Sequence, residues 1–135
     1  METGDLAELT VLGLGAVLLV IHVLLAGAFK TRQYGTSWNM GPRDATMPPL
    51  CTVAGRLDRA RGNFLETFPL AIVALLGVVV AGKANDLTAA AGWLWLASRI
   101  AYLPLYGAGV PFARSFVWGV GLLALLVALG VLLLG

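Results

Sequence analysis

Long apolar stretches alternate with short polar ones along the whole chain. A helix that crosses a bilayer needs roughly 20 mostly apolar residues, and four stretches meet that length. The pattern therefore predicts an all-α integral membrane protein that forms a single domain, a bundle of four transmembrane helices. The expected helices cover about residues 6–29, 56–82, 87–106 and 114–135, with a loop at about 30–55.

Composition supports a membrane protein and argues against a soluble one. Hydrophobic residues make up 59% of the 135 residues and charged residues 12%, whereas soluble domains are near half apolar and a quarter charged. Too few polar residues remain to cover a globule in water. Cys51 is the only cysteine, so an intrachain disulfide is excluded.

The basic residues predict the orientation. The uninterrupted apolar segments are about 6–29, 62–82, 87–106 and 115–135, and most basic residues fall between them. Arg114 lies between the last two segments, and six lie between the first two: Lys30, Arg32, Arg43, Arg56, Arg59 and Arg61. The opposite side carries Lys83 with the acids Glu2, Asp5, Glu8 and Asp86. The positive-inside rule then places the loop in the cytoplasm and both termini outside it. These arginines adjoin the bilayer and are not interleaved with exposed aromatics, so we expect no nucleic-acid partner.

Charged and polar side chains enter two of the expected helices on defined faces. Successive residues turn by about 100°, so Arg59, Asn63 and Glu66 share one face, with Arg56 at its edge and Arg61 nearly opposite. Ionisable groups inside a membrane are costly and mark functional sites by default. Glu66 is the one acid that the pattern places well inside a span.

The third expected helix repeats this arrangement with Arg99, Tyr102 and Tyr106 on one face. Two interpretations follow. Glu66 and Arg99 form an ion pair that only fixes helix packing, or the two faces line a pocket for an anionic ligand. The second is favoured because cations outnumber acids here, with Arg56, Arg59, Arg99 and Arg114 against Asp58 and Glu66. A lipid headgroup is a further candidate ligand for such a site.

His22 is the only histidine and has no partner spaced for metal binding, so we expect a helix–helix hydrogen bond there and no metal site.

The motifs on these faces resemble those of the MAPEG family, the membrane-associated proteins in eicosanoid and glutathione metabolism. The segment "RARGNFLETFP" from Arg59 to Pro69 carries the resemblance, supported by "RIAYLPLY" from Arg99 to Tyr106 and by "RS" at Arg114–Ser115. The segments "GPRD" and "PPL" before the second helix are similar to those of the bacterial branch.

The resemblance implies a homotrimer of four-helix protomers in the bacterial inner membrane. It further implies a membrane-bound, glutathione-dependent transferase or peroxidase that acts on lipophilic electrophiles. Glutathione, the co-substrate, would lie between subunits near the cytoplasmic face, and the lipophilic substrate would enter from the membrane lipids. No metal is implied.

Roles carry over by position. Arg59, Asn63 and Glu66, with Arg56 at the edge, would hold the glutathione peptide; Arg99, Tyr102 and Tyr106 would line the same pocket; and Arg114 and Ser115 would act on the thiol. Two positions depart from catalytic relatives: Gly62 stands where several have arginine, leaving Arg61 as a possible substitute, and Tyr102 stands where some have histidine.

Two other functions remain open. A non-catalytic lipid-binding or partner-binding membrane protein would use the same scaffold. A small multidrug transporter fits the size, but such exporters use a glutamate in the first span, and none lies at its centre here. The trimer is also expected on physical grounds, because an isolated protomer would expose Arg59, Asn63, Glu66 and Arg99 to lipid.

Overall fold

The structure is a computed structural model that describes the backbone of residues 3–135 and the side chains of residues 7–135. This part of the chain is helical apart from short connections, which confirms the all-α prediction. The elements are α1 (Thr3–Tyr34), α2 (Thr36–Met40), α3 (Thr52–Ala71), the π-helix η1 (Ile72–Leu76), α4 (Gly77–Val80), α5 (Asp86–Gly107) and α6 (Pro111–Leu134). The side chains of Glu2 and Asp5 lie outside the described residues.

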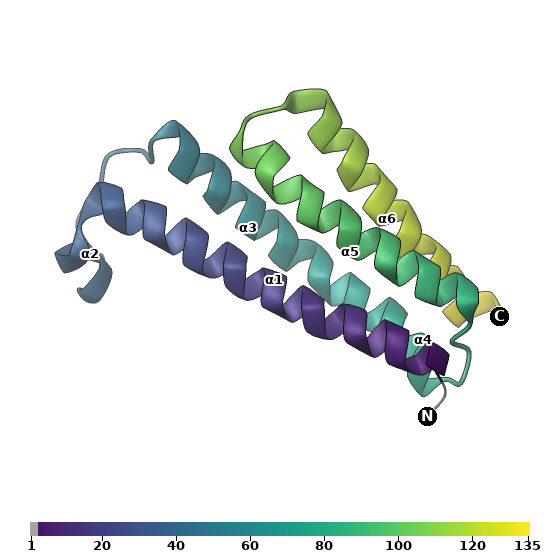
Figure 1. Cartoon of the computed structure of the whole chain (residues 1–135). Helices are drawn as coiled ribbons and strands as arrows, with labels where there is room; N and C mark the ends of the chain where they lie inside the picture. The colour runs from purple at the N-terminus through teal and green to yellow at the C-terminus, as the bar shows by residue number, and fades with distance from the viewer. Residues whose placement is uncertain (1–2) are drawn as a thin grey trace.

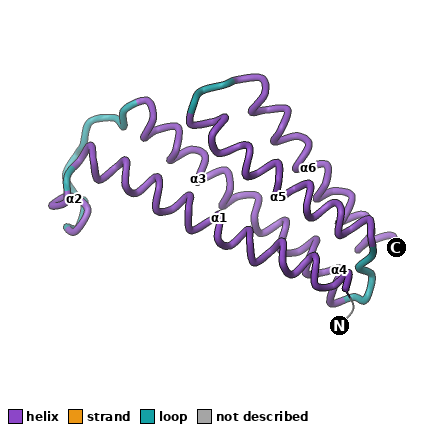
Figure 2. The backbone as a smooth tube through the Cα atoms, in the orientation of Figure 1, coloured by secondary structure: helices purple, strands orange, loops and turns teal. Residues whose placement is uncertain are grey.

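The long helices lie side by side (Figure 1). α3, η1 and α4 follow one another without a break and form one rod. α5 packs against α1, α3 and α6, so its neighbours cover much of its surface. The connection 35–51 and the turn 108–110 lie at one end of the bundle, and the turn 81–85 lies at the other end, near the start of α1 and the end of α6 (Figure 2).

Three of these helical rods are long and apolar enough to cross a membrane: Ala7–Tyr34, Thr52–Val80 and Pro111–Leu134. α5 is not among them. Arg99, Tyr102 and Pro104 lower its apolar character, and its enclosed position reduces the surface that it must present to lipid. Length and composition thus support three of the four expected spans. The fourth, α5, is helical but too polar to qualify as a membrane span on composition alone.

Local chemistry sets the helix ends. α1 continues to Tyr34 and α3 already begins at Thr52, so the connection is shorter than expected and contains α2. Gly35, with φ of 96°, takes a backbone conformation that ends α1. Asn85 caps α5 by accepting a hydrogen bond from the Thr88 amide at 2.9 Å. Pro111 occupies the first turn of α6, where a missing N–H costs nothing.

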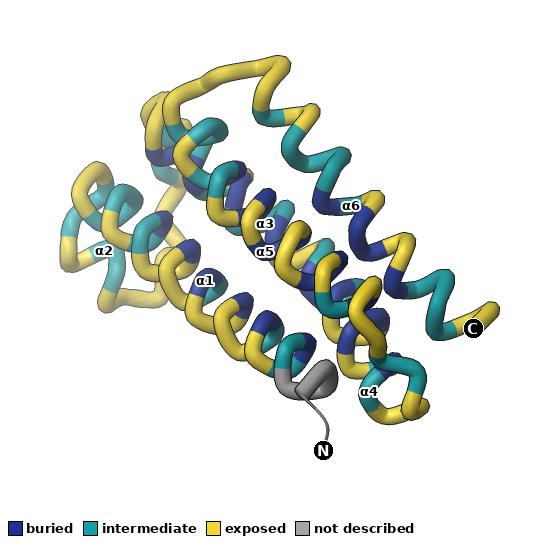
Figure 3. The backbone as a smooth tube through the Cα atoms, turned by 45° about the vertical axis from the view of Figure 1, so that its right-hand side comes forward, coloured by how far each residue is buried: buried dark blue, intermediate teal, exposed yellow. Residues whose placement is uncertain are grey.

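The core is a stack of aromatic rings between α3 and α5. Trp95 lies parallel to Phe68 at 6.0 Å between ring centroids and stacks on Phe64 at 6.1 Å. Gly15 lets α1 approach this stack, because a Cβ there would lie 3.0 Å from Phe68 and 3.2 Å from Trp95. Buried residues form inward stripes, while the outward faces are exposed and largely aliphatic (Figure 3). That arrangement suits a protein surrounded by lipid.

One expectation about α1 is wrong, and one buried acid was not anticipated. Glu8, near the start of α1, is fully buried and accepts a hydrogen bond from the Thr88 hydroxyl at 2.7 Å. His22 does not make the expected hydrogen bond, since both of its buried ring nitrogens lack a partner within the described residues. Its ring instead stacks on Phe64, with centroids 4.9 Å apart.

Candidate functional site

The two polar faces identified in the sequence meet in one cavity of about 360 Å³, here called the basic pocket. α3, α5 and α6 each contribute to its wall. Its lining residues are Arg59, Gly62, Asn63, Glu66, Tyr102, Tyr106 and Arg114. The pocket lies toward the end of the bundle that carries the 108–110 turn, because α5 ends and α6 begins there. Six of the nine predicted site residues line this single cavity.

Tyr106 joins two arginines from different helices. Arg59 of α3 donates a hydrogen bond from Nε to the Tyr106 hydroxyl at 3.1 Å. The guanidinium of Arg114, from α6, lies 4.6 Å from the centre of the Tyr106 ring. Tyr102 packs edge-on against Tyr106, with centroids 5.5 Å apart. Cation–π contact holds each guanidinium in place without neutralising its charge, so both remain available to an anion.

Arg99 lies beneath this pocket rather than in its wall. Its side chain is only 2% exposed, so the expectation that an isolated protomer exposes Arg99 to lipid is wrong. Nη1 donates a hydrogen bond to Asn63 Oδ1 at 2.8 Å, and the guanidinium lies 4.2 Å from the centre of the Tyr102 ring. Asn63 lines the pocket, and because its oxygen is engaged by Arg99, its amide N–H groups are the ones left to bind a ligand.

Arg99 also retains unused hydrogen-bonding capacity. Nε and Nη2 are buried without a partner among the described side chains. A buried guanidinium with unmet donors is costly. Its positive charge, added to those of Arg59 and Arg114, outweighs the one carboxylate of Glu66. The site is therefore built to favour an anion.

Glu66 is exposed and does not form the ion pair with Arg99 that the packing interpretation requires. The ion pairs among the described side chains are Lys30–Asp58 at 2.6 Å and Arg61–Asp58 at 2.9 Å, on another face of α3. Glu66 is therefore a free acceptor in the wall of the basic pocket, suited to a cationic group such as an ammonium.

Arg56 stands at the rim and does not line the cavity. Its Nη1 lies 3.4 Å from the carbonyl oxygen of Gly107, at the end of α5. Gly109, with φ of 76°, forms the following turn, and a Cβ there would lie 2.6 Å from Cζ of Arg56. Arg56 thus links α3 to the α5–α6 turn.

Ser115 lines a second cavity of about 410 Å³, the α6 groove, which shares Asn63, Tyr102 and Arg114 with the basic pocket. Trp118 and Gly119 complete its lining, and the sequence patterns did not place either in a site. α6 begins at Pro111, earlier than expected. Only the amides of the first turn of a helix are free to bind a ligand, and the amide of Ser115 lies beyond that turn. Ser115 can therefore contact a ligand only through its hydroxyl, which donates to the Pro111 oxygen at 3.3 Å.

Gly62 leaves an opening in the wall of the basic pocket that Arg61 does not fill. Gly62 lines the basic pocket, and nothing lies within 4 Å of the position a Cβ would take. Arg61 does not fill that space, because it bonds to Asp58 on another face. The wall is therefore open at Gly62.

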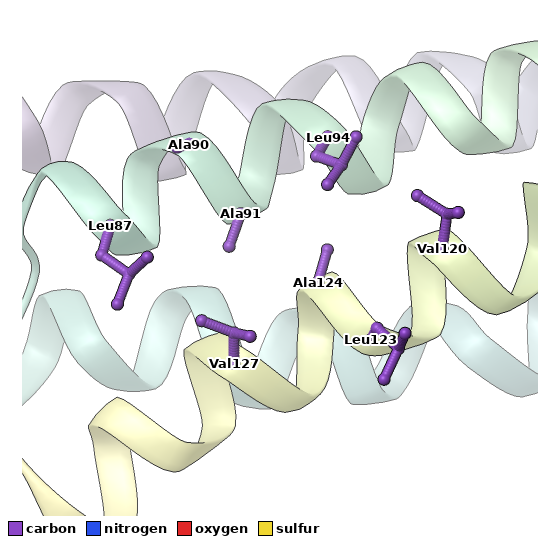
Figure 4. Close-up of a pocket in the computed structure, with 8 residues that line it drawn as sticks. All are labelled: Leu87, Ala90, Ala91, Leu94, Val120, Leu123, Ala124 and Val127. Atoms are coloured by element: carbon purple, nitrogen blue, oxygen red, sulfur yellow. The ribbon is translucent and has the colours of Figure 1, made fainter.

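A further groove, of about 310 Å³, lies between α5 and α6 toward the opposite end of α5 (Figure 4). Its lining is entirely aliphatic, with side chains from Leu87 to Leu94 on α5 and from Val120 to Val127 on α6. It offers no polar group for chemistry and suits apolar chains.

Comparison with known proteins adds one finding. The model of the MAPEG family matches residues 9–134, a range that contains every residue of both polar cavities. No curated protein and no solved structure matches the chain.

Proposed function

This chain belongs to the MAPEG family, and from that premise we propose that it is a membrane-bound, glutathione-dependent transferase or peroxidase that acts on lipophilic electrophiles. The observation that carries the proposal is the basic pocket. Glutathione has two carboxylates, one ammonium group and a thiol. The pocket offers arginines for the carboxylates, the unpaired Glu66 for the ammonium, and Arg114 near the mouth of the α6 groove.

Each role follows from position in the pocket. Arg59 binds a carboxylate from the wall, and Arg99 acts from below through the amide of Asn63. Tyr106 and Tyr102 order the arginines and offer hydroxyl groups to the peptide. Arg56 steadies the rim. Arg114 faces both cavities, so a thiol held in the basic pocket would meet an electrophile in the α6 groove.

The chemistry requires a thiolate. Arg114 stabilises the anionic sulfur, and the Ser115 hydroxyl, released from the Pro111 oxygen, donates a hydrogen bond to it. In transfer, the sulfur forms a bond to an electrophilic carbon, and the displaced group leaves with the bonding electron pair. In peroxide reduction, the sulfur attacks the outer peroxide oxygen and releases an alcohol, and a second glutathione then yields the disulfide and water.

The same proposal includes a homotrimer of the bacterial branch with α5 as the fourth span. Arg59 and Glu66 lie exposed on the chain within a helix that is apolar enough to span a membrane. Exposure of such groups to lipid costs several kcal/mol each, and a neighbouring subunit would cover them and close the pocket. The proposal also places the protein in the bacterial inner membrane, as the bacterial branch implies, and the positive-inside rule puts both termini outside the cytoplasm.

One observation favours a second function. Gly62 leaves the pocket wall open where several catalytic relatives carry an arginine, and Arg61 does not replace it. A non-catalytic protein that binds lipid or a partner on the same scaffold would tolerate that opening.

Binding and turnover separate the two functions. Purified protein in mild detergent should bind glutathione in calorimetry. Arg99→Leu should weaken binding about tenfold or more, because Asn63 loses its charged donor and the site loses one positive charge. Arg32→Gln, which removes an exposed charge outside both cavities, is the matched control. Thiol conjugation to a lipophilic aryl halide, or reduction of a lipid hydroperoxide, identifies the enzyme. Binding of glutathione without either activity identifies the second function.

Native mass spectrometry of the same sample should show three chains. A stable monomer that still binds glutathione would overturn the trimer and leave the glutathione assignment standing.

A further inference from the structure

A second basic cavity lies on the other side of α3, away from the glutathione site. We call it the loop pocket; its volume is about 190 Å³. α1, α2, the following loop and α3 all contribute to it, through Val23, Ala26, Gly27, Lys30, Trp38, Asn39, Arg43 and Arg61. It shares no lining residue with the basic pocket or the α6 groove.

Positive charge in the loop pocket is only partly balanced. Lys30 and Arg61 both pair with the same carboxylate oxygen, Oδ1 of Asp58, at 2.6 and 2.9 Å. Arg43 pairs with no carboxylate among the described side chains, and its exposed neighbour Asp44 forms no ion pair. Three cations therefore face one anion, which leaves a surplus of two positive charges. The buried Nε of Arg61 adds a donor without a partner.

Arg43 is held in position for this cavity. It is the only described residue other than glycine with positive φ, at 61°. Its Nη2 and Nε donate to the Asn39 carbonyl oxygen at 3.0 and 3.3 Å, and its guanidinium lies 4.5 Å from the Trp38 ring centre. A non-glycine residue held in a sparsely populated conformation by surrounding contacts is characteristic of ligand sites.

The surrounding loop is tied to α1, so the cavity is formed before any ligand arrives. Asn39 donates to the Thr31 hydroxyl at 2.6 Å. Gln33 donates to the Pro49 oxygen at 3.0 Å and accepts from the Cys51 amide at 2.7 Å. The Tyr34 hydroxyl donates to the Pro48 oxygen. A preformed cavity reduces the ordering cost of binding.

The remaining wall is apolar and continues into the lipid-facing surface. Val23, Ala26 and Gly27 form this wall on α1. On the same helix, the side chains of Val20 and Leu24 are 54% and 66% exposed. A ligand with an anionic head and an apolar tail would contact both the basic side chains and the apolar wall. A free inorganic anion would contact only the basic side chains.

We propose that the loop pocket binds the phosphate of an anionic phospholipid, held by Lys30, Arg43 and Arg61, with the acyl chains along α1. Basic pockets between membrane helices bind such headgroups, and an indole ring at the interface is a common anchor. The site is independent of glutathione and is present in either of the functions proposed above.

Native mass spectrometry of delipidated protein tests the proposal, with phosphatidylglycerol and phosphatidylcholine added at equal concentrations. We expect preferential binding of phosphatidylglycerol, and Arg43→Gln should lower its affinity about tenfold, the effect of losing a charge-assisted contact. Arg43→Lys, which keeps the charge, should lose less. Arg32→Gln removes an exposed positive charge from the same end of α1, outside the cavity, and should change affinity less than twofold.

Three outcomes would overturn the lipid assignment: equal binding of the two lipids, equal losses in Arg43→Gln and Arg32→Gln, or protection against thermal unfolding by inorganic phosphate without any binding of phosphatidylglycerol. A melting temperature equal to that of the wild type shows that Arg43→Gln is folded, and unchanged glutathione affinity shows that the two sites are separate.

Discussion

Replacement of Arg114 by alanine is the sharpest test of catalysis. Arg114 is the cation that lines both polar cavities, and it is held 4.6 Å from the Tyr106 ring centre. Arg59 and Arg99 remain in the variant, and Arg59 keeps its own bond to Tyr106. The change therefore removes charge near the proposed thiol position while it preserves the groups assigned to the glutathione carboxylates.

The size of the effect follows from electrostatics. A free thiol has a pKa of about 8.5, so only about 3% is thiolate at pH 7. Opposite unit charges about 6 Å apart interact by roughly 2.8 kcal/mol at an effective dielectric constant of about 20. That energy lowers the pKa of the bound thiol by about two units, since one unit is about 1.4 kcal/mol. Most of the bound glutathione is then thiolate at pH 7.

Without Arg114, the bound thiol should return to a few per cent thiolate. We expect conjugation at pH 7 to fall by about 20-fold or more, while the dissociation constant for glutathione changes only a few fold. Arg114→Lys should retain much of the thiolate because it retains the charge. Raising the pH toward 9 should restore part of the lost rate in the alanine variant, since solvent then removes the proton.

The assay is the ultraviolet absorbance of the bound thiolate, titrated across pH for wild type, Arg114→Ala, Arg114→Lys and the surface control Arg32→Gln. If the wild type shows no thiolate band below pH 8, the pocket does not activate the thiol, and the non-catalytic function replaces the enzyme. If the alanine variant keeps the wild-type band, activation resides in other groups, and the role assigned to Arg114 is wrong.

Other contacts give further predictions. Glu66→Gln should leave the unfolding temperature unchanged, because the side chain is exposed and unpaired, but weaken glutathione binding about tenfold; calorimetry and a melting curve check both parts, and a large loss of stability would restore a packing role. Asn63→Ala should destabilise the fold by about 1–3 kcal/mol, because it removes the acceptor of buried Arg99; an unchanged denaturation midpoint would contradict this. Glu8→Ala should destabilise by a similar amount and Glu8→Gln by much less, because glutamine keeps an acceptor for the Thr88 hydroxyl; equal midpoints in the two variants would show that this bond contributes little.

The sequence by itself determined the protein class and the composition of the polar site. Apolar length requires helices in a membrane, because every backbone group must be bonded within the protein there. The 3.6-residue period then places Arg59, Asn63 and Glu66 on one face, and Tyr102 and Tyr106 on another. The cavity unites these faces. Charges in an apolar helix are few and costly, so each is informative even without a structure.

Tertiary packing decided what each polar group does. The sequence left open an ion pair between Arg99 and Glu66 that only fixes helix packing. The packing of α3 and α5 instead places Arg99 beneath the pocket on Asn63 and leaves Glu66 free. In the sequence, Glu8 is one of several acids near the N-terminus. In the fold, it accepts a hydrogen bond from Thr88, 80 residues away. Such pairings depend on how helices rotate and cross.

The loop pocket depended on tertiary structure most of all. Its three basic residues, Lys30, Arg43 and Arg61, are far apart in the sequence. From the sequence alone, they indicate only which side of the membrane faces the cytoplasm. The fold brings them onto one wall, where Asp58 balances only one of the three charges. Helical periodicity relates residues three and four apart, whereas contact between a loop and two helices is set by the whole chain. The physical reason is that local geometry repeats along a helix, while packing between helices does not.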